Sequence, residues 1–374
     1  MTNKHSATHN LIPAPYDTND LSASIYDYKK QARKRLLLLA GLSALVIIAF
    51  LMDLYIGSQG LSYETFMQGL FHSEIAPGEI NKRAVVIVWD IRMPSAIMAL
   101  LIGMILAVSG AQMQTVLKNP LADPFTLGLS SAAGFGASLA IVLNQSFASY
   151  LPIPDAFFIP LNAFIFSLMT ALLVSFAGIV KRLTPATVTL LGIATMFGFN
   201  ALLTLVEYLA SADQLQELLF WIMGSLAKAS WLDIKILLAF MLVSLPLIFI
   251  NAWKLTAIRA NEELARARGI SAERIRVQVL IVVSLLTAAA VSFAGTIGFV
   301  GLVAPHIARM LVGEEQRWFL PATLLIGAAV MSFTSLISKA LVPGVLFPVG
   351  VITALIGIPF FLSLILSSKR SHWS

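Results

Sequence analysis

Long apolar stretches, separated by short polar ones, run along most of this chain. A helix needs about 20 predominantly apolar residues to cross the hydrocarbon core of a membrane. Runs of or near that length recur from Leu36 to Leu366. Because backbone in lipid must satisfy its own hydrogen bonds, each run is expected to be helical. The pattern predicts an all-α integral membrane protein with about ten transmembrane helices, at residues 36–56, 93–113, 125–143, 157–180, 187–210, 231–250, 277–296, 299–312, 319–338 and 349–366.

Composition supports the membrane assignment and excludes several kinds of site. Hydrophobic residues make up 58% of the 374 positions and charged residues only 12%, whereas soluble domains are about a quarter charged. The chain has no cysteine, which excludes disulfides, thiolate metal sites and iron–sulfur clusters.

The net charge of +6 is explained by topology and does not indicate nucleic-acid binding. Basic residues next to spanning segments mark the cytoplasmic side of a membrane protein. With both termini inside the cell, 19 of the 25 basic residues fall in cytoplasmic segments. The six left outside are Lys82, Arg83, Arg92, Lys228, Lys235 and Lys339.

The ten helices form one predicted domain with a short tail at each end. Residues 1–35 are polar and end in a basic cluster, so they are expected to be a disordered cytoplasmic tail. Residues 36–366 form the transmembrane domain, and residues 367–374 form a cytoplasmic tail. The first apolar run lies too far from the start for a cleaved signal peptide and is interpreted as a retained helix.

Glycine and proline break the helical pattern in two places, one in each half of the chain. Pro120, Pro124 and Gly128 break the start of the third span, next to Asn119. Gly298, Gly301 and Pro305 lie at the eighth span, which is too short to cross alone. Irregular backbone at membrane depth occurs inside protein or beside a watery cavity. The two breaks therefore suggest an inverted repeat around a transport pathway; the alternative is the ordinary enrichment of glycine and proline in membrane helices.

Three long motifs carry a family resemblance. The first runs from Arg92-Met-Pro94 through Ser109-Gly-Ala111 and Gln114 to Asn119-Pro-Leu-Ala-Asp-Pro124 and Leu127-Gly128. The second is Gly298-Phe-Val-Gly-Leu-Val-Ala-Pro-His306-Ile-Ala-Arg309, followed by Leu320-Pro321. The third is Pro348-Val-Gly350, with Thr353, Gly357 and Pro359-Phe360. In this order and spacing they resemble the FecCD family, the iron-siderophore, haem and cobalamin permeases of ABC importers.

The resemblance implies a ten-helix permease of the type II ABC importer fold, working as a homodimer or with a paralogous permease. It also implies two cytoplasmic ATPase subunits and a periplasmic or lipid-anchored substrate-binding protein as partners. The sequence contains no Gly-x-x-x-x-Gly-Lys-Ser/Thr phosphate loop and no nucleophile–base constellation. We therefore expect a transport subunit that is not itself an enzyme, without cofactor or metal site, in the cytoplasmic membrane of a bacterium.

The longest charged segment between spans, residues 259–276, resembles the coupling helices that contact the ATPase. Helix is expected over Glu262–Arg268, Gly269 suits a helix stop, and Ser271 can cap a second short helix. Asn261 and Arg268 differ from the residues usual in the family, Gly and Leu. The residues expected to couple to the ATPase are Glu262, Glu263, Leu264, Ala265, Arg266, Arg268 and Gly269.

Two more sites follow from the resemblance. Arg92 and Lys339 match basic positions that pair with glutamates of the binding protein, although long side chains at a membrane surface also snorkel without any partner. Thr184, Pro185 and Ala186 fall at a turn that resembles the cytoplasmic gate, although any tight loop can contain proline.

Three polar residues lie within or near the predicted spans and need an interpretation of their own. A single His306 makes a poor iron site and is better explained by a structural hydrogen bond at a helix break. Glu207 is either a pathway residue or an acid that reaches the interface. Asp53 is expected to meet water at the outer end of the first span.

The leading hypothesis for function is ferric siderophore import. Haem or cobalamin import by the same mechanism is equally compatible with the motifs, since nothing in the sequence discriminates among these cargoes. A proton-coupled secondary transporter would need buried acids, for which Glu207 alone is thin support. No constellation supports an intramembrane enzyme.

Overall fold

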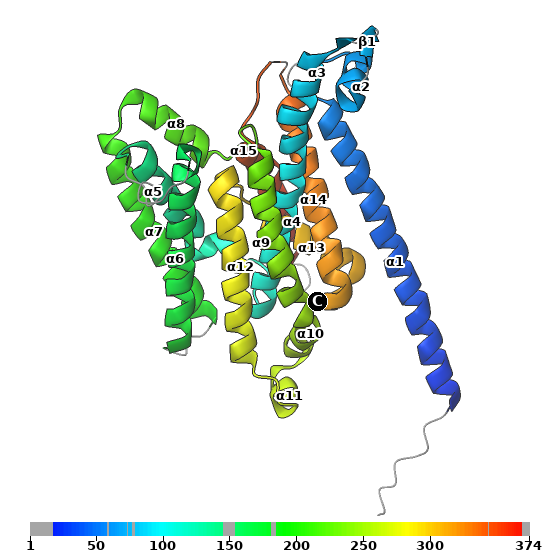
Figure 1. Cartoon of the computed structure of the whole chain (residues 1–374). Helices are drawn as coiled ribbons and strands as arrows, with labels where there is room; N and C mark the ends of the chain where they lie inside the picture. The colour runs from blue at the N-terminus through cyan, green and yellow to red at the C-terminus, as the bar shows by residue number, and fades with distance from the viewer. Residues whose placement is uncertain are drawn as a thin grey trace, which may run out of the picture.

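The computed structural model describes residues 18–57, 60–72, 74–76, 79–144, 154–180, 185–342 and 344–368. Each of the ten predicted spans is represented by a helix (Figure 1). They are α1 (Thr18–Tyr55), α4 (Met93–Val116), α5 (Leu129–Ile141), α6 (Phe158–Val180), α7 (Pro185–Leu209), α9 (Trp231–Ile250), α12 (Ala272–Ala294), α13 (Val300–Val312), α14 (Gln316–Ala340) and α15 (Val349–Ser368).

Seven helical segments among the described residues are long and apolar enough to cross a membrane. Shorter apolar helices are α5, α13 and the apolar part of α15. This agrees with the expectation that the eighth span, here α13, is too short to cross alone. The predicted all-α membrane fold is confirmed.

Short elements that the apolar pattern did not predict connect the spans. Between α1 and α4 lie α2 (Tyr63–Phe71), a hairpin of β1 (Glu74–Ala76) and β2 (Glu79–Ile80), and α3 (Lys82–Val86). The two strands pair antiparallel, with Glu74 opposite Ile80 and Ala76 opposite Glu79. The others are α8 (Ala212–Ile222), α10 (Ala252–Ala260), α11 (Glu262–Ala267), and the 3₁₀ turns Pro124–Leu127 and Asp155–Phe157.

These connections mark the two ends of the bundle. Figure 1 shows α2, α3 and β1 at one end and α10 and α11 at the other. The α11 end carries basic residues that the charge pattern placed in the cytoplasm, and the α3 end carries Lys82 and Arg83. We refer to them below as the α11 end and the α3 end.

Helix α1 begins earlier than expected. It starts at Thr18, so residues 18–35, predicted to be part of a disordered tail, are helical in the structure; residues 1–17 lie outside the described part. No glycine or proline occurs between Tyr16 and Ala40 to stop the helix. Ala, Leu, Gln, Lys and Arg, which favour helix, are frequent there. The polar composition of residues 18–35 was therefore compatible with a helix that continues into the first span.

Helix α4 lies at the centre of the packed core. It contacts α14, α12, α13 and α9, and most of its residues are buried. Glycines allow the close crossings: a Cβ added at Gly103 would overlap the Gly327 carbonyl of α14, and one at Gly110 would overlap the Gly301 carbonyl of α13. Small residues at such contacts let helix backbones approach, as is usual in membrane bundles. Helices α5, α6 and α7 pack together beside this core, and α1 packs on α14.

Candidate functional site

The segment expected to contact the ATPase is built as the sequence predicts. The Asn261 side chain accepts a hydrogen bond from the Leu264 amide at 3.0 Å and caps α11. Gly269 has φ +79°, a left-handed conformation that favours glycine. Its amide donates to the Arg266 carbonyl at 2.9 Å, and the Ile270 amide donates to the Ala265 carbonyl at 3.0 Å. These two hydrogen bonds form the Schellman motif, which ends a helix.

The helix that follows differs from the expectation in one respect. Ser271 caps it, with the Arg274 amide donating to its hydroxyl at 3.5 Å, but this helix is the long span α12, not a second short helix. A six-residue helix and a tight stop therefore lead directly into a helix that traverses the bundle.

The residues of α11 and of the helix stop that follows it divide into an exposed and a buried set. Leu264 is 59% exposed, and Glu263, Arg266, Arg268 and Gly269 are exposed as well. Ala265 is only 2% exposed and packs in the chain's own core. It therefore helps hold α11 in place, while Leu264 is available to a partner.

Glu262 ties α11 to the end of α4. Its carboxylate lies 2.6 Å from the Lys118 ammonium, 3.0 Å from the Arg266 guanidinium and 3.7 Å from that of Arg276. The hydrogen bond from Lys118 is the largest influence and lowers the pKa of Glu262. Arg276 also donates to the Val116 carbonyl, the last residue of α4, at 3.0 Å. Helix α11 is thus fixed to the body of the protein by charges that lie far apart in sequence.

A second acidic residue, Glu314, holds α10. It lies between α13 and α14 and accepts two hydrogen bonds from Arg259 of α10, one of them 2.7 Å long between Nε and Oε2. The Arg309 guanidinium lies 3.1 Å from Glu314. The hydrogen bonds from Arg259 lower the pKa of Glu314.

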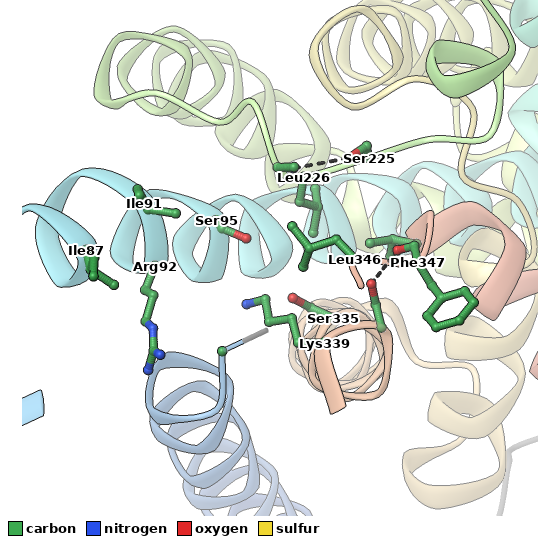
Figure 2. Close-up of a pocket in the computed structure, with 14 residues that line it drawn as sticks. Ile87, Ile91, Arg92, Ser95, Ser225, Leu226, Ser335, Lys339, Leu346 and Phe347 are labelled. Atoms are coloured by element: carbon green, nitrogen blue, oxygen red, sulfur yellow. Dashed lines mark hydrogen bonds between the residues drawn. The ribbon is translucent and has the colours of Figure 1, made fainter. Parts of the chain in front are cut away.

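At the α3 end, Arg92 and Lys339 line one cavity. It has a volume of about 180 Å³ and also contains Ser95, Ser335 and Ser338. Figure 2 shows Arg92 reaching toward the neighbouring helix, with Lys339 on the other side of the cavity. The resemblance assigned both residues to docking but did not indicate that they share one cavity or that they are buried.

Neither basic side chain points freely into solvent. Arg92 is 6% and Lys339 is 9% exposed. Lys339 donates to the Asp53 carboxylate of α1 at 2.8 Å, and Arg92 donates to the Tyr55 carbonyl of the same helix. Asp53 is fully buried, so the expectation that it meets water is wrong. Its partner lies 286 positions away and could not be read from the local pattern.

Arg92 lies within a continuous helical segment. A six-residue π-helical turn, Ile87–Arg92, joins α3 to α4, so the helical segment continues from Lys82 to Val116. Such π turns are rare and are found frequently at functional sites.

The residues of the two predicted breaks lie in the turn after α4, at the start of α13 and, for Pro305, within α13. The Asn119 side chain accepts a hydrogen bond from the Leu121 amide at 3.0 Å and shapes the turn with Pro120. Gly298 precedes α13, and Gly301 packs against α4. Pro305 is buried within α13, where the His306 ring lies edge-on to Phe360. No three His, Cys, Asp or Glu side chains gather as a metal site in the part of the chain that is described.

Buried polar contacts around these breaks were missed at the sequence level. Gln114 donates to the Gly301 carbonyl at 3.3 Å and accepts from Arg309 at 3.0 Å. Burial raises the pKa of Asp123, which caps the 3₁₀ turn before α5, to about 6. The available signal was the presence of amide and acidic side chains within or beside an otherwise apolar helix.

The predicted gate cannot be placed. Thr184 lies outside the described residues; Pro185 and Ala186 are the first residues of α7, and their side chains are outside what is described. Glu207 is partly buried near the end of α7.

Comparison with known proteins decides the family. The model of the FecCD transport family matches residues 45–367. This chain belongs to that family. It is 33% identical to the iron(3+)-hydroxamate import system permease protein FhuB of Bacillus subtilis over 337 residues, covering 90% of this chain and 84% of the relative.

A haem permease and a solved structure are similarly related to this FecCD family member. It is 33% identical to the hemin transport system permease protein HmuU of Yersinia pestis, covering 76% of this chain and 85% of the relative. A solved structure of a metal-chelate type ABC transporter in an inward-facing conformation matches with a TM-score of 0.76 and 30% identity, covering 88% of this chain and 99% of that one. The family expected from the motifs is confirmed, and with it a permease subunit of an ABC transporter.

Proposed function

We propose that this chain is the permease of an ATP-driven importer that moves a ferric siderophore across the cytoplasmic membrane of a bacterium. Two copies would form the pathway at their interface, or one copy with a paralogous permease. Two ATPase subunits would dock at the α11 end, and a periplasmic or lipid-anchored binding protein would deliver cargo at the α3 end.

The observation that carries the proposal is the construction of α11. A small exposed surface around Leu264 stands on a helix that is stopped by Gly269 and anchored by Glu262. A short helix that is held by several contacts can transmit a displacement of a soluble subunit to the bundle, because these contacts prevent it from moving independently of the bundle. The second observation is the family relationship, in which the named relatives are permease proteins.

Cargo is inferred from the relatives alone. The Bacillus protein is named for iron(3+)-hydroxamate import and the Yersinia protein for hemin transport. Ferric siderophore is our first choice, haem is the alternative supported by a relative, and cobalamin remains the third member of the family's cargo range.

We also propose that Arg92 and Lys339 contribute to docking of the binding protein, in a way that is constrained by their partners within the chain. Because Lys339 is paired with Asp53 and Arg92 with the Tyr55 carbonyl, a binding protein would have to draw them out or use other groups at this end. Charges at the rim of an interface mainly steer association. The binding protein would therefore contact exposed groups first and the cavity afterwards.

Single cysteines test the orientation and the docking surface together, since the chain has none of its own. We expect Ala267→Cys, exposed in α11, to crosslink to the ATPase subunit and to resist an impermeant thiol reagent added outside whole cells. Lys228→Cys, whose side chain is 89% exposed near the start of α9, is the matched control and should show the opposite behaviour. Labelling of Ala267→Cys from outside would overturn the orientation and the docking site at once.

A substitution tests the function of that surface. Leu264→Asp should leave insertion and folding unchanged, because the side chain is exposed, while abolishing cargo-stimulated ATP hydrolysis and uptake. Lys254→Asp in α10, outside the α11 surface, is the control and should retain both activities. Normal uptake by Leu264→Asp would remove α11 from the ATPase contact.

A further inference from the structure

A continuous line of polar contacts runs from α10 to the glycine-rich start of α13. Arg259 of α10 binds Glu314 through two hydrogen bonds, and Glu314 lies 3.1 Å from Arg309. Arg309 donates to the Gln114 side chain at 3.0 Å, and Gln114 donates to the Gly301 carbonyl at 3.3 Å. The line crosses from a connecting helix at the α11 end to a break in the transmembrane helices.

The inner members of the line have few alternatives to these partners. Gln114 is fully buried, so its amide cannot turn to water if Arg309 or Gly301 moves away. The Arg309 side chain is 17% exposed and its guanidinium lies 5.5 Å from the centre of the Phe319 ring. Leaving a buried polar group without a partner is unfavourable, which favours movement of the connected groups as one unit.

The last member of the line is fixed to backbone. The Gly301 carbonyl packs so closely on Gly110 of α4 that a Cβ at Gly110 would overlap it. Gly298 and Phe299 precede it, and Phe299 has φ +68°, an uncommon conformation for a residue with a side chain. The start of α13 is therefore held in one defined arrangement by contacts to α4.

The outer members connect this arrangement to the proposed coupling segment. Arg259 is the second-last residue of α10, and Asn261, which caps α11, follows α10 directly. Glu314 is shared between Arg259 and Arg309, so a shift of α10 changes the position of the carboxylate that Arg309 also contacts. Arg309 contacts both groups: it lies 3.1 Å from the Glu314 carboxylate and donates a hydrogen bond to Gln114.

We infer that Arg309 is a positioning residue that transmits displacement of α10 and α11 to the start of α13, through Glu314 on one side and Gln114 on the other. The inference rests on the proposed function, because it names how the ATPase cycle reaches a helix break in the bundle. It assigns Arg309 no contact with cargo or ATP. Its loss should separate ATP hydrolysis from transport.

The experiment measures cargo taken up per ATP hydrolysed in proteoliposomes that contain the complete transporter with its ATPase and binding protein. The cargo is iron bound to a hydroxamate chelator, with haem tested in parallel. We expect Arg309→Gln to retain ATP hydrolysis within about twofold while uptake per ATP falls by about tenfold, within the range known for residues that modulate coupling. Arg317→Gln is the control, because Arg317 lies beside the line and pairs with Glu315 instead.

Two further variants keep the test decisive if Arg309→Gln fails to fold. Glu314→Gln removes the carboxylate charge that both arginines contact, without altering α13, and should also lower uptake per ATP. Arg259→Gln combined with Glu314→Gln should lower it no further than the single changes, because the residues act in series. Unchanged uptake per ATP in Glu314→Gln, or additive losses in the double variant, would overturn the inference. Absence of ATP-dependent uptake in the unaltered transporter would instead overturn the proposed function.

Discussion

At the scale of single residues, the pair of Lys339 and Asp53 is the feature that local sequence could not reveal. Both side chains are buried and lie 2.8 Å apart, on α14 and α1. Removal of one member of a buried ion pair costs about 3–5 kcal/mol, whereas replacement of both by apolar residues is often neutral. The pair therefore fixes the position of α1 against α14.

We expect Lys339→Met to lower the free energy of unfolding by about 3 kcal/mol, because Asp53 is left without its cation. Thermal unfolding in detergent measures the loss. The double variant Asp53→Leu with Lys339→Met should recover most of it, and Lys82→Met, at an exposed position, should change little. Equal stability of Lys339→Met and the unaltered protein would contradict the buried pair.

The crossing of α4 and α13 gives a second prediction at this scale. A Cβ at Gly110 overlaps the Gly301 backbone, whereas one at Gly41 of α1 meets nothing within 4 Å. Gly110→Ala should therefore destabilise the protein by about 1–3 kcal/mol through overpacking. Gly41→Ala should be neutral or stabilising by up to about 1 kcal/mol, from helix propensity. The same thermal measurement separates them, and a tolerated Gly110→Ala would show that the two backbones can part.

At the scale of elements, the sequence predicted the spans better than the connections. Ten apolar runs have ten corresponding helices, because length and hydropathy decide a span locally. The helix stop at Gly269 was also readable, since few residues adopt its backbone conformation. Helices α2, α3, α8 and α10 were missed because short elements leave no long apolar run.

The contacts that complete the site were harder to predict than the elements. Lys118 and Glu262 are 144 positions apart, and Arg309 and Gln114 are 195 apart. Their pairing depends on how α4, α11 and α13 pack, which no local pattern contains. The burial of Arg92 has the same cause, since a π-helical turn within a continuous helix directs it toward α1.

The acidic anchors of α10 and α11 predict a pH dependence. Hydrogen bonds from Lys118 and Arg259 lower the pKa of Glu262 and of Glu314 below 4.5. A carboxylate with a lowered pKa stabilises the folded state above its unfolded pKa and loses that contribution as pH falls through the folded value. Hydrogen-exchange protection of residues 252–267 should thus be constant from about pH 8 to pH 5.5 and fall only below about pH 4.5. Loss of protection near neutral pH would contradict these anchors.

At the scale of the whole molecule, the bundle has a different kind of feature at each end. The α11 end presents a small exposed helix anchored by charges, and the α3 end encloses a cavity with two buried cations. The polar line through Arg309 connects the first end to the interior of the bundle. This polarity is what an importer requires, since cargo arrives at one side of the membrane and energy at the other.

The central claim is that energy for transport comes only from a partner ATPase. Its most direct test is uptake of a ferric hydroxamate into proteoliposomes that contain this chain with and without its ATPase, in the presence of the loaded binding protein. The chain alone should hydrolyse no ATP and should give no uptake, even with an imposed proton gradient. With the ATPase present, ATP should drive uptake of the ferric chelate or, for the alternative cargo, of haem. ATP turnover by the chain alone, or uptake driven by the proton gradient without the ATPase, would contradict the account.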